Sequence, residues 1–216
     1  MGKQWVRKQM KENELAAVVE KAALWLRYHP QTVLWGGIGT LAAAVIIAVS
    51  ANRHISVREE CWSKLAAAQT YAYSGQIDEA IGQAKSLAEE QPSSAAAGFG
   101  ILLTGDLLYQ QEKFKEAADA YARVLDAQRH EALVPLATAG RGLSQESLGD
   151  YRAAADTAQG FLDSFQDHFL APQVHASLAR CLSGLGEAEK AKATYERMEF
   201  LYPDTYWAQW AKDRKG

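Results

Sequence analysis

Four short stretches between residues 75 and 195 repeat one another at a constant spacing. The stretches GQIDEAIGQA, EKFKEAADAY, GDYRAAADTA and GEAEKAKATY align without gaps, and at intervals of 37 residues they place Ala80, Ala117, Ala154 and Ala191. Twelve positions earlier, the same register aligns a second column of small residues, Ala68, Gly105, Gly142 and Ala179. A fixed period of this length is the signature of a repeat architecture, and it limits the possible folds more strongly than composition does.

The columns predict helical hairpins. Two antiparallel helices approach closely only where small residues face each other, so the two small columns indicate the two arms of a hairpin. Four and seven positions beyond the alanine column, mostly larger residues fill the space against the next hairpin: Ala84, Tyr121, Ala158 and Tyr195, then Leu87, Val124, Phe161 and Met198. Turns between arms are expected at Gly75, Gly149 and Gly186, with Glu112 in the fourth.

One hairpin cannot bury its apolar face alone, so the hairpins must stack. We therefore predict an all-α fold in which residues 54–216 form a solenoid of four hairpins with a period of 37. This pattern resembles the tetratricopeptide repeat, in which a small residue, a later alanine, an aromatic residue and a terminal proline recur at these offsets. The resemblance covers residues 61–204 and places Pro92 opposite Pro203.

Two features depart from the tetratricopeptide pattern. The period is 37 residues rather than about 34, and the bulky early positions are filled weakly, by Lys64, Ile101, Thr138 and His175. Longer links between hairpins, such as QPSSAAAGF and LAPQ, would hold the additional residues.

An uncharged segment precedes the repeats. Residues 32–51, TVLWGGIGTLAAAVIIAVSA, supply about the 20 apolar or small residues that a ~30 Å hydrocarbon core requires. A buried core helix is usually shorter and interrupted by polar residues. A cleaved signal peptide is the other alternative, since Ala48, Val49 and Ser50 before Ala51 resemble a peptidase site, although the apolar run exceeds about 15 residues and a long segment precedes it. We expect an uncleaved transmembrane anchor over residues 31–53.

Charge is divided unevenly along the chain. Residues 1–30 hold six Lys or Arg and three Glu, a charge of +3, so the remaining residues carry −6 of the chain's net −3. Because Lys and Arg stay on the cytoplasmic side, the N-terminal segment should face the cytoplasm and the repeats should be translocated. We therefore predict a single-pass membrane protein with an extracytoplasmic solenoid.

Residues 1–30 are themselves patterned. An apolar stripe at helical spacing predicts an amphipathic helix that Pro30 ends: Leu15, Val18, Val19, Ala22 and Leu26. This helix would lie on anionic membrane lipid, with Trp5, Trp25 and Tyr28 at the headgroups. The alternative, strongest for residues 1–13, is a solvated tail that only sets topology.

The expected anchor also has one smooth face. Small residues recur every four positions, at Gly36, Thr40, Ala44 and Ala48, so another transmembrane helix could pack closely there. The alternative is a plain tether, because Gly and Ala are common in membrane helices.

The first arm of each hairpin should line a concave groove for partner proteins. Its exposed positions are predicted to be Trp62, Gln69, Tyr73, Phe99, Asp106, Tyr109, Glu146 and Arg180. The alternative for Trp62, Phe99 and Tyr109 is packing between hairpins. Recognition of a C-terminal carboxylate is not expected, since that mode needs several Lys, Arg and Asn and only Arg180 qualifies.

The sequence does not indicate an enzyme. Its five histidines form no HxxxH or HExxH spacing, and no phosphate-binding glycine loop or GxSxG motif occurs outside the apolar segment. The acidic repeats would repel nucleic acid, and Cys61 and Cys181 are expected to be isolated buried thiols. We expect no cofactor, no metal and no small-molecule substrate.

The whole arrangement, an N-terminal helix, one span and a translocated solenoid, is similar to the bacterial family that includes the ancillary periplasmic subunit of the Sec translocon. That resemblance implies an accessory factor that helps to hand emerging proteins to periplasmic chaperones. The alternative is a permanent structural or assembly subunit of a larger inner-membrane complex. Both hypotheses make the partners other membrane or periplasmic proteins.

Overall fold

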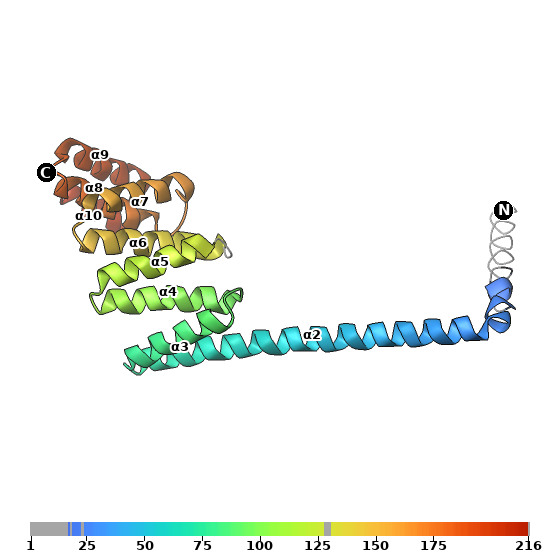
Figure 1. Cartoon of the computed structure of the whole chain (residues 1–216). Coiled ribbons are helices and arrows are strands. Elements are labelled where there is room, and N and C mark those ends of the chain that lie inside the picture. The colour runs from blue at the N-terminus through green and yellow to red at the C-terminus, as the bar shows by residue number, and fades with distance from the viewer. Residues whose placement is uncertain (1–16, 18, 23, 128–130, 216) are drawn as a thin grey trace, which may run out of the picture. The chain divides into compact units, whose positions relative to one another are not determined.

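The computed structural model describes residues 17–215 except 18, 23 and 128–130. All regular elements of the described residues are helices (Figure 1). The chain divides into two compact units, Met1–Val57 and Arg58–Gly216.

The first unit contains the apolar segment. Its described residues are helical as far as Tyr28, and helix α2, Pro30–Tyr73, begins after a break at His29, where Pro30 was expected to end the preceding helix. Part of the predicted amphipathic segment, residues 1–16, 18 and 23, lies outside the described residues, and this part includes Trp5, Leu15 and Val18. One window of α2 has a mean hydropathy of 2.1 and none of it is buried, which makes α2 the one described helix long and apolar enough to cross a membrane.

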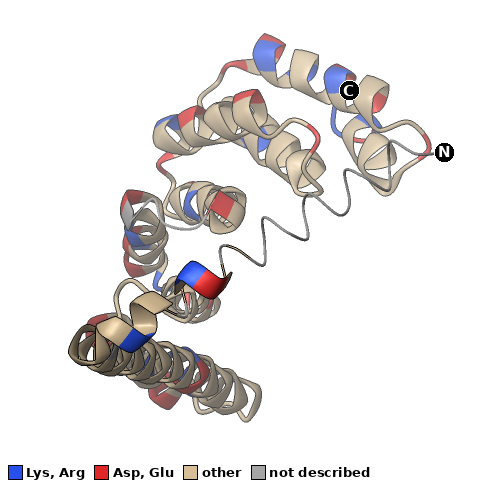
Figure 2. Cartoon of the chain, turned by 90° about the vertical axis from the view of Figure 1, so that its right-hand side faces the viewer, with Lys and Arg blue, Asp and Glu red and all other residues tan. Residues whose placement is uncertain are grey.

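The second unit is a stack of helical hairpins, as the 37-residue period predicts (Figure 1). The last part of α2 pairs with α3 (Ile77–Glu90), α4 (Ala95–Gln110) with α5 (Phe114–Ala127), α6 (Val134–Ser147) with α7 (Tyr151–Ser164), and α8 (Ala171–Gly184) with α9 (Ala188–Leu201). The short helices η1 (Glu131–Leu133) and α10 (Tyr206–Lys212) complete the unit. Figure 2 shows both acidic and basic residues on its helices.

The four hairpin turns share one geometry. Two residues after the end of each first arm lies a residue with positive φ, and these residues are Gly75 (79°), Glu112 (60°), Gly149 (80°) and Gly186 (76°). The residue after each of them donates its backbone N–H five residues back, for example from Gln76 to the Tyr71 carbonyl at 2.9 Å and from Lys113 to the Leu108 carbonyl at 2.9 Å. This is the Schellman ending of a helix, and it recurs every 37 residues at the predicted positions.

The predicted columns are the packed interior. The alanine column, the small column and the two larger columns that follow them are all buried. Ala80, Ala117 and Ala154 have no exposed surface. The two small columns do not face each other directly as predicted, because Gly105 faces the Tyr121 ring and Gly142 faces Thr157. The weak early column also lies inward: Lys64, Ile101 and Thr138 are half-buried and His175 is buried. The repeat register of the sequence is therefore the packing register of the solenoid.

Helix α10 covers the end of the last hairpin. Ala211 is buried in the same apolar cluster as Tyr195 and Met198, and Trp207 and Trp210 pack against that cluster. The Arg214 guanidinium lies 4.3 Å from the centre of the Trp210 ring. A terminal cap of this kind protects an interface that the next repeat would otherwise bury.

Candidate functional site: a hollow between the first arms

The first arms of three successive hairpins border a hollow of about 420 Å³. Helices α4, α6 and the start of α8 supply most of its lining, and α5 adds one side chain. The lining residues are Leu102, Asp106, Tyr109, Gln110, Tyr121, Leu136, Ala139, Gly140, Leu143, Leu170 and Gln173. This volume falls within the ~300–1,000 Å³ of ordinary ligand sites, and the mixture of apolar walls with a few polar groups is also typical of them.

Tyr121 reaches the hollow from a second arm because two glycines make room for it. Its ring lies against Gly105 of α4 and Gly140 of α6, and a Cβ atom at these positions would lie 2.7 and 2.5 Å from ring atoms. No larger residue could occupy either position without displacing the ring. Tyr121 is buried, and its side chain forms part of the lining of the hollow.

The Tyr121 hydroxyl donates a hydrogen bond of 2.6 Å to Oδ1 of Asp106. Loss of solvent around the hollow raises the pKa of the Asp106 carboxyl, and the hydrogen bond from Tyr121 opposes part of that rise. The same loss of solvent, together with the adjacent carboxylate, raises the pKa of Tyr121 well above its ordinary value, so that the phenol remains a donor. The pair gives the hollow a fixed acceptor.

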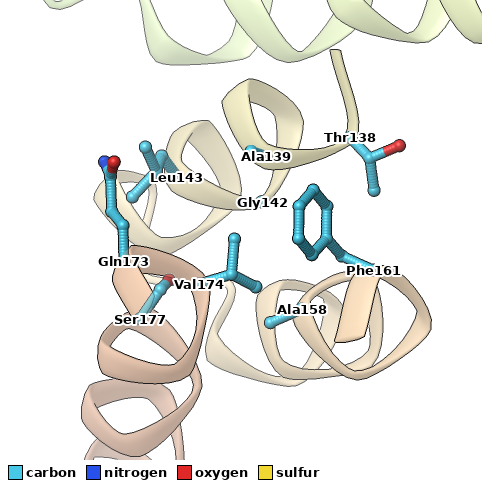
Figure 3. A pocket seen from close by; sticks show the side chains of 9 residues that line it. All are labelled: Thr138, Ala139, Gly142, Leu143, Ala158, Phe161, Gln173, Val174 and Ser177. Atoms are coloured by element: carbon cyan, nitrogen blue, oxygen red, sulfur yellow. The ribbon is translucent and has the colours of Figure 1, made fainter. Parts of the chain in front are cut away.

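A second, much smaller cavity lies between α6, α7 and α8 (Figure 3). Thr138, Phe161 and Val174 are among the side chains around it, and its volume of about 10 Å³ leaves room for roughly one water molecule. It shares Ala139, Leu143 and Gln173 with the hollow. We interpret it as a packing gap behind the hollow, because no ligand larger than water would fit.

Two predicted groove aromatics lie against each other. The Trp62 ring on α2 and the Phe99 ring on α4 have centres 5.8 Å apart, and the residues remain 42% and 37% exposed. The two rings therefore pack between neighbouring hairpins and also keep exposed surface. On α2, Gln69 is also exposed, and Tyr73, the last residue of this helix, is 93% exposed.

Tyr109 and Asp106 are the two predicted residues that the structure places in the hollow. Tyr109 is half-buried, with its ring 5.2 Å from that of Phe114 and its hydroxyl 3.1 Å from the Ser147 hydroxyl. It therefore links two first arms along the edge of the hollow.

Glu146 and Arg180 bind each other. The Arg180 guanidinium donates to both carboxylate oxygens of Glu146, at 2.5 and 2.9 Å, and Ser177 donates to one of them at 2.5 Å. The hydrogen-bonded Glu146 carboxylate raises the pKa of Arg180. This bidentate pair ties α6 to α8 and neutralises two of the charges predicted to face a partner.

Sequence reasoning missed most of the hollow. Tyr121 was assigned to the packed column only, and Gln110, Gln173 and the leucine walls were not singled out. The available signal was the pair of glycines at 105 and 140, which lie on different arms and both face the same tyrosine ring.

The small face of α2 lies on an exposed helix. Gly36, Thr40, Ala44 and Ala48 are all exposed, and the Thr40 hydroxyl donates to the Gly37 carbonyl at 2.9 Å within the helix. Cys61 and Cys181 are both free and buried. Within the described part of the chain, no group of three or more His, Cys, Asp or Glu side chains is placed to hold a metal ion.

Comparison with known families and structures agrees with this fold. The tetratricopeptide repeat family model matches residues 65–132 and 102–169. A tetratricopeptide repeat protein from Parabacteroides merdae superposes with a TM-score of 0.61 at 13% identity, over 70% of this chain and 57% of that one. MamA from Desulfovibrio magneticus gives 0.59 at 15% identity, over 72% and 85% of the two chains.

A third solved structure is that of YrrB, described as a tetratricopeptide repeat protein with an unusual peptide-binding site. It gives a TM-score of 0.53 at 17% identity, over 70% of this chain and 76% of that one. Comparison with curated proteins gave no match. The family model thus identifies tetratricopeptide repeats within residues 65–169, and the second unit is an all-helical solenoid of hairpins of that type. Such a fold is a scaffold for binding other proteins.

Proposed function

We propose that the chain is a membrane-anchored scaffold whose hollow receives segments of partner proteins. The observation that carries this proposal is the hollow of about 420 Å³ between first arms, lined by leucines, two glutamine amides, Tyr109 and Asp106. The peptide-binding site described for YrrB supports a peptide as the ligand. The exposed Trp62, Gln69, Tyr73 and Phe99 form a second contact surface on the first two hairpins, and the paired Glu146 and Arg180 supply polar contacts beside the hollow.

Two matched variants test the hollow. Gln173→Trp places an indole in the hollow, whereas Gln159→Trp places one on the exposed face of α7. Partners captured from membranes in mild detergent and identified by mass spectrometry should be lost with Gln173→Trp and retained with Gln159→Trp. Equal capture by both variants would argue against the hollow as the binding site.

We propose further that α2 anchors the protein in a bacterial inner membrane, with the N-terminus in the cytoplasm and the solenoid in the periplasm. The uncharged window of α2 and the excess of Lys and Arg before it support this orientation. A reporter that is active only outside the cytoplasm should work after Gly216 and fail before Trp5. The reverse pattern would overturn the localisation.

Within that membrane we assign the protein to protein translocation, as an accessory factor that passes emerging proteins to periplasmic chaperones. The open hollow favours transient clients, because a permanent subunit would bury broad apolar surfaces instead. Several partners in low and variable yield are expected on purification. A single set of membrane proteins at equal stoichiometry would favour the alternative, a structural or assembly subunit.

The small face of α2, Gly36, Thr40, Ala44 and Ala48, is proposed to pack on a transmembrane helix of a partner. Replacing Gly36, Thr40 and Ala44 with Leu keeps the segment apolar and fills that face. Loss of membrane partners with unchanged insertion supports the packing face, and undiminished co-purification leaves α2 as a plain tether.

A further inference from the structure

Asp106 gives the hollow its charge. Among the described residues that line the hollow, it is the one with a carboxyl group, and no Lys, Arg or His is among them. No ion pair formed by the described residues includes it, whereas the nearby Glu146 is paired with Arg180. The hollow therefore presents a net negative site within an acidic solenoid.

The carboxylate is held in place before a ligand arrives. Tyr121 donates to Oδ1 at 2.6 Å, and the tyrosine ring is fixed between two glycines of neighbouring first arms. An ionised carboxylate has about four lone-pair directions, and Tyr121 uses one of them. Asp106 is exposed at the surface of the hollow, so the remaining directions are open to a donor.

The surroundings of Asp106 fit a long cationic side chain better than a bare ion. Leu102, Leu136 and Leu143 offer apolar walls on which the methylene stem of a Lys or Arg can lie. The amides of Gln110 and Gln173 can donate to and accept from the backbone of a bound segment. Walls of low polarity also strengthen the attraction between opposite charges.

We infer that the hollow selects partner segments in which a Lys or Arg lies beside aliphatic residues, and that Asp106 is the specificity-determining residue. This inference rests on the proposed function, because it names the kind of segment that the hollow takes. A C-terminal carboxylate is not expected in the hollow, since Asp106 would repel such a group.

The test uses the full chain in mild detergent, immobilised and exposed to a phage-displayed library of random peptides. The parent protein should enrich peptides that carry Lys or Arg next to Leu, Ile or Val. Asp106→Asn keeps the shape of the side chain and removes its charge, so the preference for Lys and Arg should disappear. The control Asp119→Asn removes the same charge from an exposed position on α5 outside the hollow and should behave as the parent does.

A second measurement isolates the contact. For the best enriched peptide, replacing its cationic residue with Met should weaken binding to the parent about tenfold, which is the size expected for a charge-assisted hydrogen bond. The same replacement should change binding to Asp106→Asn much less. Thermal melting of both variants should match the parent, because the amide oxygen that Asp106→Asn introduces can still accept the hydrogen bond from the Tyr121 hydroxyl.

The outcomes separate the two proposals. Enrichment of peptides without a preference for Lys or Arg, or a preference retained by Asp106→Asn, would show that the inference is wrong while the peptide-binding function stands. Enrichment of no peptide by the parent would remove the proposed function, and the inference with it.

Discussion

Single residues decide where the hollow forms, and Gly140 is the position among them that is most sensitive to substitution by a larger residue. A Cβ atom there would lie 2.5 Å from the Tyr121 ring, whereas at Gly142, further along the same helix, the nearest atom is Cγ2 of Thr157 at 3.4 Å. Gly140→Ala should lower the free energy of unfolding by about 1–3 kcal/mol through overpacking. Gly142→Ala should be neutral or stabilising by up to about 1 kcal/mol through helix propensity. Chemical denaturation measures both, and equal effects would contradict the role of Tyr121.

His175 makes stability depend on pH. It is 3% exposed, with Nδ1 2.9 Å from the Tyr202 hydroxyl and 3.1 Å from the Ala171 carbonyl. Burial lowers its pKa, so the folded protein favours the neutral ring. The unfolded chain then binds more protons once the pH falls below about 6.5, and the free energy of unfolding decreases there.

We therefore expect His175→Gln to flatten the decline in unfolding free energy that sets in as the pH falls below about 6.5. His54→Gln, at an exposed position, should keep the parent slope. Denaturant titrations at several pH values provide the measurement, and an unchanged slope in His175→Gln would assign the pH dependence to other groups.

Predictions from the sequence were least successful for the contacts of individual side chains. Asp106 and Tyr109 were predicted from their positions on the first arm and lie in the hollow. Glu146 and Arg180 were predicted by the same rule, but their pairing depends on two side chains 34 residues apart adopting compatible rotamers. A periodic pattern specifies which face a residue occupies, and it does not specify which neighbour the side chain meets.

At the scale of elements, the turn at Glu112 differs from its three equivalents. It adopts a φ of 60° that glycine adopts freely and that costs other residues about 1–2 kcal/mol. Glu112→Gly should raise the free energy of unfolding by about 1 kcal/mol, and the reciprocal Gly149→Glu should lower it by a similar amount. Thermal and denaturant unfolding test this pair, and a destabilised Glu112→Gly would mean that its side chain makes a contact that offsets the strain.

The interface between arms tolerates only small residues. Ala154 lies in the apolar core with no exposed surface, so Ala154→Leu should cost about 1–3 kcal/mol of unfolding free energy. Ala67→Leu, an exposed alanine on α2, is the matched control and should be nearly neutral. Similar small effects at both positions, measured by denaturation, would mean that the arms can separate without loss of packing.

Elements were predictable because three independent signals coincide every 37 residues. Small residues mark where arms meet, larger residues mark where hairpins meet, and the turn residues end each first arm. The hollow was not predictable at this scale, because it depends on how far successive first arms diverge. That divergence follows from the summed volumes of many side chains, such as the Tyr121 ring between two glycines.

For the molecule as a whole, the reactivity of the two cysteine thiols allows the unfolding of the first and fourth hairpins to be followed separately. Cys61 and Cys181 are both buried, and burial raises the pKa of the Cys181 thiol to about 11. Neither should react quickly with iodoacetamide in the native protein, since the thiolate is the reactive form. Repeat arrays open hairpin by hairpin, and the fourth hairpin is covered by α10.

In a denaturant series, Cys61 should therefore react at lower denaturant concentration than Cys181. The variants Cys181→Ser and Cys61→Ser allow each remaining thiol to be followed alone by mass spectrometry. Simultaneous reaction of both thiols would instead mean that the solenoid unfolds as one cooperative unit.

The common turn geometry has a consequence for how such a protein changes over generations. The residue types that recur in every copy are those that the fold requires. At the repeat position of Asp106, by contrast, the four copies hold an amide, an acid, an aliphatic residue and a base, namely Gln69, Asp106, Leu143 and Arg180. Mutation at this position can alter the chemistry offered to a ligand without touching the turns or the small columns. The four copies differ there while their turns are alike, so a substitution in one hairpin can change the binding preference of that hairpin alone.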